Sequence, residues 1–383
     1  AKVGGALSQA YPATFGLGGI ANNFVSGMAG GVAGAATRSL LTGTDFGDNI
    51  LADLPSVIGN TIGNAIAGKF DEFRVQRRID AALGAPATKA QEQAASNAIA
   101  DDPVNSLQWG GKPLGAAEAQ QLIIDRIKLD EIYATSMGTD PVFLRKYLAF
   151  RSSLTAADAY NTTSNQAILG ADLTRTSGDY VRGIISDNRG NGYQGYLYHD
   201  NVGDRNIFAN AGTNDALDLR TDYELGGDTY VSQLDTAAQN ARQLLLNEVP
   251  NLSFTGHSLG GPLAILQGLT IGRPVETFNS APFSSALAKV YGVRLSAANR
   301  LVTNYRVAND PLSMAENNHA LITAGALALE EIPVLGRRLP SDLPSRAWHL
   351  APPPGRMISL PASSATGLAA HSIVNVANLL TAW

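Results

Sequence analysis

The fold of this chain is decided by one stretch, Asn251-Leu252-Ser253-Phe254-Thr255-Gly256-His257-Ser258-Leu259-Gly260-Gly261, which Pro262-Leu263-Ala264-Ile265-Leu266 follows. The apolar residues before Gly256 predict a buried strand, and those after Gly261 predict a helix. Between them the chain must reverse sharply, and glycines on both sides of Ser258 avoid the crowding that a β-carbon would cause there. We therefore predict a nucleophile elbow, in which the serine hydroxyl stands exposed between strand and helix. The alternative is a serine and glycine loop that only links the two elements.

A serine hydroxyl becomes a good nucleophile only when a base takes its proton, and that base needs a third group to orient it. The sequence has five histidines, His199, His257, His319, His349 and His371. In hydrolases with this elbow, the acid and then the histidine follow the serine along the chain, so His199 is in the wrong order. His257 lies inside the elbow, and we expect its side chain to point away from the serine's partner. We predict His371 as the base because it lies on a loop that opens the final helix, whereas the polar and proline-rich surroundings of His319 and His349 indicate exposed or lid-packed side chains.

The acid is predicted from a second strand. Residues 301–308 are rich in β-branched and aromatic side chains, and Asp310 follows them directly. A carboxylate at the carboxyl end of a parallel strand faces the same crevice as the elbow serine. We therefore predict Asp310 as the acid, the alternative being that it only opens a turn before Pro311. Asp342 is a rival, but its proline-containing surroundings indicate a surface loop.

Four segments together resemble the class 3 lipase family of α/β-hydrolases, which includes bacterial lipases and relatives of phospholipase A1. They are Ala156-Ala157-Asp158-Ala159-Tyr160-Asn161, Phe208-Ala209-Asn210-Ala211-Gly212-Thr213-Asn214-Asp215, the elbow itself, and Thr277-Phe278-Asn279-Ser280-Ala281-Pro282-Phe283. The resemblance covers about residues 152–383. The chain departs from the family pattern at Asn210-Ala211, where an arginine-bearing segment is usual, and at Asn279, where glycine is usual and where we expect only local packing to change.

The resemblance implies a role for each site residue. Ser258 is implied as the nucleophile, Asp310 and His371 complete a triad, and the backbone N–H groups of Leu259 and Thr213 form an oxyanion hole. Such donors must be in place where negative charge develops on the attacked carbonyl, and the loss of one reduces transition-state stabilisation by about 3 kcal/mol. The N–H of Leu259 also follows from the elbow geometry alone.

The predicted fold class is α/β, with a mostly parallel central sheet flanked by helices and preceded by a helical N-terminal region rich in glycine and alanine. We divide the chain into an arm over residues 1–70, a helical region over 71–150 and a catalytic α/β-hydrolase domain over 151–383. Within that domain, residues 313–360 form a lid-like insertion, and its apolar part over 320–335 is predicted either to line an acyl pocket or to be a packed helix.

Small residues at spacings of three and four characterise residues 1–70. This composition resembles the glycine-zipper segments found near the carboxyl ends of large secreted bacterial proteins. Polar and charged residues interrupt every apolar run before it reaches about 20 residues, so we predict no membrane span. We expect close-packed helices or a partly ordered arm, with peripheral membrane contact as the alternative.

Composition excludes several classes of function. The chain has 383 residues, 28 of them basic and 33 acidic, and its net charge of −5 argues against nucleic acid as a partner. It has no cysteine, which excludes thiol chemistry and disulfides. The loop Asp187–Gly192 carries oxygen ligands that calcium accepts, but its residues are more typical of a turn between strands. Because the chain begins with Ala1 and no leader precedes the fold, we expect a processed or excised portion of a longer protein.

The sequence therefore predicts a bacterial serine carboxylic ester hydrolase, secreted or associated with the cell envelope, that acts on lipid esters as a lipase or phospholipase A1. No cofactor and no metal is needed for this chemistry. One alternative is an esterase for short-chain or polymeric esters. The other is a secreted membrane-interaction or toxin module in which the hydrolase domain is auxiliary.

Overall fold

The computed structural model describes residues 71–101, 108–109, 112–113, 115–176, 181–188, 190–212, 232–313, 352–365 and 368–382. The predicted arm over residues 1–70 and the predicted acyl-pocket segment over 320–335 lie outside these ranges. The chain divides into two compact units, Ala1–Arg78 and Ile79–Trp383. Of the first unit only residues 71–78 are described, and they are helical. The remaining description concerns the second unit.

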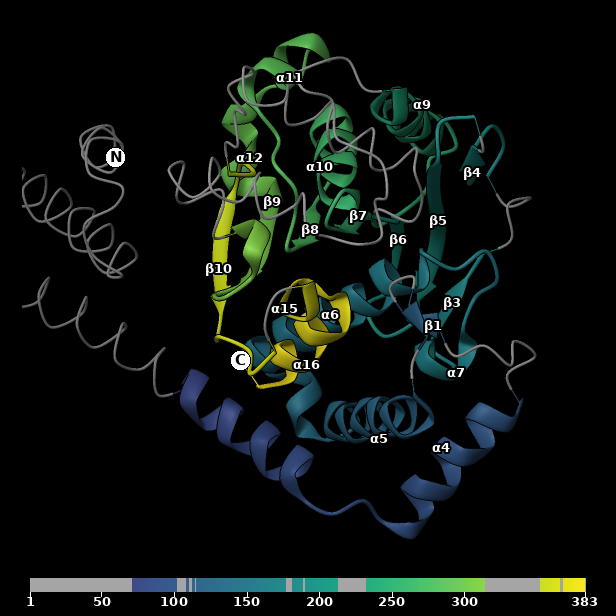
Figure 1. Ribbon diagram of the computed structural model, residues 1–383, viewed down its shortest axis with the longest axis vertical. Helices are drawn as coiled ribbons and strands as arrows, with labels where there is room; N and C mark the ends of the chain where they lie inside the picture. Colours follow the sequence, from purple (N-terminus) through teal and green to yellow (C-terminus); the bar gives the residue numbers. More distant parts are fainter. Residues whose placement is uncertain are drawn as a thin grey trace, which may run out of the picture. The chain divides into compact units, whose positions relative to one another are not determined.

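An eight-stranded sheet forms the centre of this unit (Figure 1). Its main path runs in the order β10-β9-β8-β7-β6-β5-β3, and β4 pairs with β5 off that path. Neighbours from β6 to β10 are parallel, whereas β5 is antiparallel to β3, β4 and β6. The mostly parallel sheet predicted from the sequence is therefore confirmed. The strands are β3 (Leu173–Arg175), β4 (Asp187–Asn188), β5 (Tyr193–Asp200), β6 (Arg205–Asn210), β7 (Leu252–His257), β8 (Val275–Phe278), β9 (Val302–Val307) and β10 (Arg356–Leu360).

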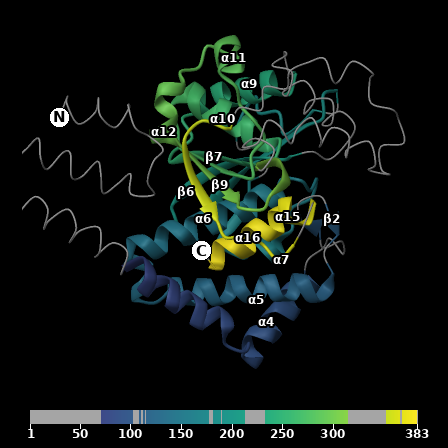
Figure 2. The ribbon, with the colours of Figure 1, turned by 60° about the vertical axis from the view of Figure 1, so that its left-hand side comes forward.

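Helices cover both faces of the sheet (Figure 2). On one face α10 packs on β6, β7 and β8 and contacts α9, and on the other α6 packs on the same three strands and contacts α16. A short hairpin, β1 (Gln108–Trp109) and β2 (Lys112–Pro113), lies apart from the main sheet. The α-helices are α4 (Lys89–Asp101), α5 (Ala116–Tyr133), α6 (Pro141–Asp158), α7 (Gln166–Leu169), α9 (Ser232–Leu246), α10 (Gly260–Ile271), α11 (Ser285–Val290), α12 (Ala298–Leu301), α15 (Leu368–His371) and α16 (Ile373–Ala382).

Local sequence explains where the two central helices begin and end. The side chain of Asp140 accepts hydrogen bonds from the first free amides of α6, and Pro141 occupies the first helical position, where its missing N–H is no loss. Helix α10 ends at Gly272, whose φ of 71° places it in the left-handed region that glycine tolerates. Every residue of α10 from Gly260 to Gly268 is buried, as expected for a helix that is apolar on all sides. No helix among the described residues is both long enough and apolar enough to cross a membrane.

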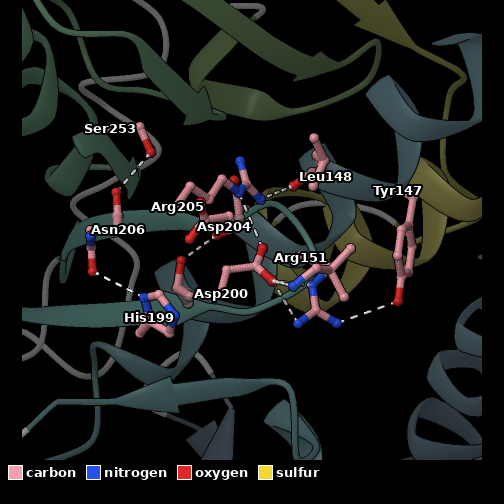
Figure 3. A network of polar contacts seen from close by, with 12 residues as sticks. Tyr147, Leu148, Arg151, His199, Asp200, Asp204, Arg205, Asn206 and Ser253 are labelled. Atoms are coloured by element: carbon pink, nitrogen blue, oxygen red, sulfur yellow. Dashed lines mark hydrogen bonds and ion pairs between the residues drawn. The ribbon is translucent and has the colours of Figure 1, made fainter. Parts of the chain in front are cut away.

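A buried ion-pair network joins α6 to the turn between β5 and β6 (Figure 3). The register of β5, β6 and β7 places this turn at the end of the strands opposite the elbow. Asp200, which is fully buried, accepts hydrogen bonds from Arg151 Nε at 2.9 Å and from Arg205 Nε at 3.1 Å. Arg205 also donates to the backbone carbonyl of Leu148 at 2.7 Å. A buried carboxylate shared by two guanidinium groups is well compensated. The network therefore fixes α6 against the turn between β5 and β6.

We predict that Asp200→Asn lowers the free energy of unfolding by about 3 kcal/mol, because Arg151 and Arg205 then lose their closest counter-charge and keep only the longer contacts to Asp130 and Glu276. Chemical denaturation monitored by circular dichroism measures this change. Asp204→Asn is the matched control, because Asp204 is an exposed residue of the same turn. Its backbone is left-handed, a conformation that asparagine also tolerates. Equal stability of the two variants would show that the network contributes nothing.

Candidate active site

Ser258 lies where β7 ends and α10 is about to begin, as the sequence predicts. Its φ of 54° is left-handed, a conformation that an L-residue adopts only where the surroundings enforce it. The backbone N–H of Ser258 donates to Phe278 O, and its carbonyl accepts from Gly261 N and Ala281 N. These bonds hold the turn, and the serine side chain remains half-exposed.

The glycines of the elbow are required by close backbone contacts. A β-carbon on Gly256 would lie 2.1 Å from Gly260 O, and one on Gly260 would lie 2.3 Å from Asn210 O. Both distances are far below van der Waals contact. The steric role predicted for these two glycines is confirmed, and it lets the elbow pack directly against the end of β6.

The structure brings three predicted site residues together through the imidazole of His371. Its Nε2 lies 2.9 Å from Ser258 Oγ, and its Nδ1 lies 2.7 Å from Asp310 Oδ1. His371 is the last residue of the four-residue helix α15, just before α16, whereas the sequence predicts a loop that begins the final helix. The arrangement allows Ser258 to donate its proton to Nε2 while the carboxylate accepts the Nδ1 proton, because a neutral imidazole has one donor and one acceptor nitrogen.

Asp310 is fully buried just after β9. Its Oδ2 accepts hydrogen bonds from the backbone N–H of Ser313 at 2.8 Å and from the Ser313 hydroxyl at 2.5 Å. Burial alone would raise the pKa of this carboxyl, but the hydrogen bond and charge of His371, together with the two Ser313 bonds, outweigh burial and lower the pKa. The carboxylate is therefore ionised at neutral pH and suited to orient the imidazole.

Of the two predicted oxyanion donors, the structure describes only Leu259. Leu259 is buried and is the N-cap of α10, where the positive end of the helix dipole favours a developing negative charge. Thr213 lies outside the described residues, which end on this segment at Gly212. A β-carbon on Gly212 would meet Tyr160 Oη at 2.0 Å and His257 O at 2.7 Å, so the segment leaves β6 in direct contact with the elbow.

Asn210, which stands where the family pattern has an arginine-bearing segment, serves as a buried connector. Its Oδ1 accepts from the Tyr193 hydroxyl at 2.8 Å, and its Nδ2 donates to Gln267 Oε1 at 2.7 Å. Gln267 belongs to α10 and Tyr193 to β5. Asn210 therefore fixes the end of β6 to both neighbouring elements.

The other histidines and the rival acid fall into three groups. His319, His349 and Asp342 lie outside the described residues. His199 lies in β5, with Nδ1 3.3 Å from Asn206 Oδ1. The orientation expected for His257 is wrong, because its Nε2 lies 2.7 Å from the backbone oxygen of His371. Spacing in the sequence gives no signal for a bond to a backbone carbonyl 114 residues away.

Two further residues beside the site were missed by the sequence analysis. Asn279 was expected to affect only local packing, yet its Nδ2 donates to His371 O at 3.1 Å. Its φ of 42° lies in the left-handed region, which glycine and asparagine adopt more readily than other residues. Ser313 lies within the span assigned to the lid-like insertion, and its contact with Asp310 was not anticipated.

No group of three or more potential metal-ligating side chains occurs among the described residues. The loop considered for calcium connects β4 to β5, which pair antiparallel. Within it Asn188 Oδ1 accepts from Gly190 N, and Asn191 Oδ1 accepts from Tyr193 N. The turn chemistry favoured from the sequence is therefore confirmed.

Comparisons with known proteins point to lipid ester hydrolysis. Residues 147–345, just over half of the chain, match the phospholipase-like family described as the Tle-like phospholipase domain. An alignment over 138 residues, which covers 33% of the chain, shows 28% identity to a protein of Penicillium rubens named "putative lipase atg15". The chain spans 18% of the length of that relative.

We predict that Asp310→Asn lowers the free energy of unfolding at neutral pH by about 2 kcal/mol, because charge-assisted hydrogen bonds are lost. The pKa of Asp310 is lowered in the folded protein, so its stabilisation is complete above the unfolded pKa of about 3.9 and disappears as pH falls through the lower folded value. The gap between wild type and variant should therefore close below about pH 4.

Urea denaturation at pH 7 and at acid pH measures this gap. Asp204→Asn, which changes an exposed residue, serves as control and should differ little from wild type at either pH. A gap for Asp310→Asn that stays constant down to the lowest pH at which the protein folds contradicts the prediction.

Proposed function

This chain belongs to the family of Tle-like phospholipase domains and is a lipid ester hydrolase, and from that premise we propose that Ser258, His371 and Asp310 hydrolyse the ester as a catalytic triad. The observation that supports the proposal best is the position of one imidazole, 2.9 Å from a serine oxygen and 2.7 Å from a buried carboxylate. These are the distances over which the required proton transfers occur.

In the first half of the reaction, His371 accepts the hydroxyl proton of Ser258 while Oγ attacks the ester carbonyl carbon. The resulting oxyanion is held by the backbone N–H groups of Leu259 and Thr213. When the tetrahedral intermediate collapses, the carbon–oxygen bond of the ester breaks. His371 gives its proton to the departing alcohol, which leaves an acyl-enzyme on Ser258.

In the second half, His371 removes a proton from water, and the hydroxide oxygen attacks the acyl carbonyl. Collapse of this intermediate releases the fatty acid, and the proton returns to Ser258 Oγ. Asp310 stays ionised throughout and stabilises the imidazolium form of His371. The lowered pKa of Asp310 supports this role.

For the substrate we propose an acyl ester of a phospholipid, cleaved as by a phospholipase A1. The family description supports a phospholipid over a triacylglycerol or a short-chain ester. We further propose that the protein is secreted or associated with the cell envelope, and that residues 1–70 make peripheral contact with the membrane that holds the substrate. Cell fractionation and vesicle sedimentation of the chain with and without residues 1–70 test these two points.

We predict that Ser258→Ala lowers the turnover of phosphatidylcholine by about 10⁴-fold or more, since the variant lacks the hydroxyl that we propose attacks the carbonyl. Release of fatty acid measures turnover, and thermal unfolding verifies that the variant folds. Ser253→Ala is the matched control. Ser253 lies on β7, the strand that leads to Ser258, and donates to Asn206 O, and its loss is expected to leave turnover near the wild-type value. Turnover retained by Ser258→Ala would contradict the triad.

A panel of esters separates the substrate classes. We expect hydrolysis of phosphatidylcholine to exceed that of triacylglycerol and of p-nitrophenyl butyrate at equal ester concentration. Preference for the short ester would instead indicate an esterase. If Ser258→Ala still permeabilised phospholipid vesicles while all ester turnover was lost, the membrane-interaction alternative would replace the proposal.

A further inference from the structure

His257, the neighbour of the proposed nucleophile, is buried and bonded through both ring nitrogens. Its Nδ1 lies 2.8 Å from the hydroxyl of Tyr160, and its Nε2 lies 2.7 Å from the backbone oxygen of His371. The rings of His257 and His371 lie close to each other, with centroids 4.9 Å apart. The histidine that the triad does not use therefore contacts the backbone of the histidine that it does use.

The backbone oxygen of His371 fixes which ring nitrogen of His257 carries a hydrogen. A carbonyl oxygen only accepts, so Nε2 is the donor. In the neutral tautomer with its hydrogen on Nε2, the Tyr160 hydroxyl donates to the lone pair of Nδ1. A neutral ring suits this position because His371 becomes positively charged during acyl transfer, and a second cation beside it would oppose that charge.

Asn279 supplies a second donor to the same carbonyl. Its Nδ2 lies 3.1 Å from His371 O, and its Oδ1 accepts from the backbone N–H of Val307 at 2.9 Å. Val307 ends β9, three residues before Asp310. The side chain of Asn279 therefore connects the backbone of the proposed base with the strand that carries the proposed acid.

The hydroxyl of Tyr160 also contacts the segment that leads to Thr213. A β-carbon on Gly212 would lie 2.0 Å from Tyr160 Oη, so the hydroxyl packs directly against this glycine. Tyr160 follows the last turn of α6, which the sheet and the ion-pair network of Asp200 hold in place. The Tyr160 hydroxyl therefore connects the end of α6 to Gly212, which contacts the elbow. Through His257 the same hydroxyl is connected to the backbone of His371, the proposed base.

We propose that His257 and Tyr160 are positioning residues, which together with Asn279 hold the backbone of residue 371 so that its imidazole keeps both of its hydrogen bonds. The inference rests on the proposed function, because it assigns a purpose to these contacts only if His371 is the base. In this role neither residue contacts the substrate. Their loss should therefore lower kcat while KM stays nearly constant, since misplacement of a catalytic group by 1 Å reduces rate by about 10²-fold.

The test compares full-length His257→Ala, His257→Gln and Tyr160→Phe with wild type in phospholipid turnover. His257→Ala should lower kcat by about 10²-fold with little change in KM. The Nε2 of glutamine is separated from Cβ by as many bonds as the Nε2 of histidine, so His257→Gln retains the donor to His371 O and should recover about tenfold of that loss. Tyr160→Phe removes the hydroxyl that bonds His257 Nδ1, and we expect a kcat about tenfold below wild type.

Labelling of Ser258 by a fluorophosphonate provides a second readout, because the label reacts only with an activated serine. We expect labelling rates to fall in parallel with kcat. The matched control is His199→Ala, which removes a histidine of β5 that bonds Asn206 and none of the site residues named above. That variant should turn over and label at wild-type rates.

Each result has one meaning for the proposal. Turnover and labelling within twofold of wild type in folded His257→Ala overturn the proposal. Equal losses of kcat in His257→Ala and His257→Gln, together with equal losses of thermal stability, also overturn it. If His257→Ala does not fold, wild-type kcat in folded His257→Gln and Tyr160→Phe overturns it. A wild-type chain that neither hydrolyses esters nor takes the label overturns the proposed function itself, a result distinct from the first three.

Discussion

The imidazole of His371 must reach a serine oxygen on one side and a carboxylate on the other, and the rest of the fold is arranged to satisfy that constraint. The three residues come from segments after β7, after β9 and before α16. A parallel sheet makes this convergence simple, because neighbouring strands end at the same edge. The antiparallel strands β3 and β5 lie beyond β6 in the sheet and contribute no residue to the proposed triad.

Convergence alone does not keep the geometry, because a buried polar group without a partner is costly and mobile groups lose alignment. The structure meets this requirement with hydrogen bonds to each member. Ser313 donates twice to Asp310, and Asn279 donates to the carbonyl of His371. Backbone bonds fix the left-handed turn of Ser258. Most of these donors lie in segments that the sheet brings together only after folding.

Sequence alone predicts those site residues whose signal lies in their immediate neighbours along the chain. The elbow is specified by glycines that cannot carry a β-carbon, and Asp310 follows a strand visible from its β-branched residues. Chain order excluded His199, and His371 was preferred to His319 and His349 because it lies on a loop that begins the final helix. His257 was assigned the wrong direction because its partner is a backbone oxygen, and the Asp200 network was not anticipated because its members are far apart in sequence. Membership in the lipase and phospholipase group was readable from motifs, whereas the finer placement among class 3 lipases stays a prediction.

The separation of Ser258 from His371 along the chain has a consequence for synthesis. The two side chains that lie within one hydrogen bond of each other are 113 residues apart in sequence. On the ribosome the hydroxyl is therefore made long before the imidazole, and at about 5–20 residues per second the interval lasts several seconds or more. During that interval the nascent polypeptide carries the elbow serine without the imidazole that we propose as its base.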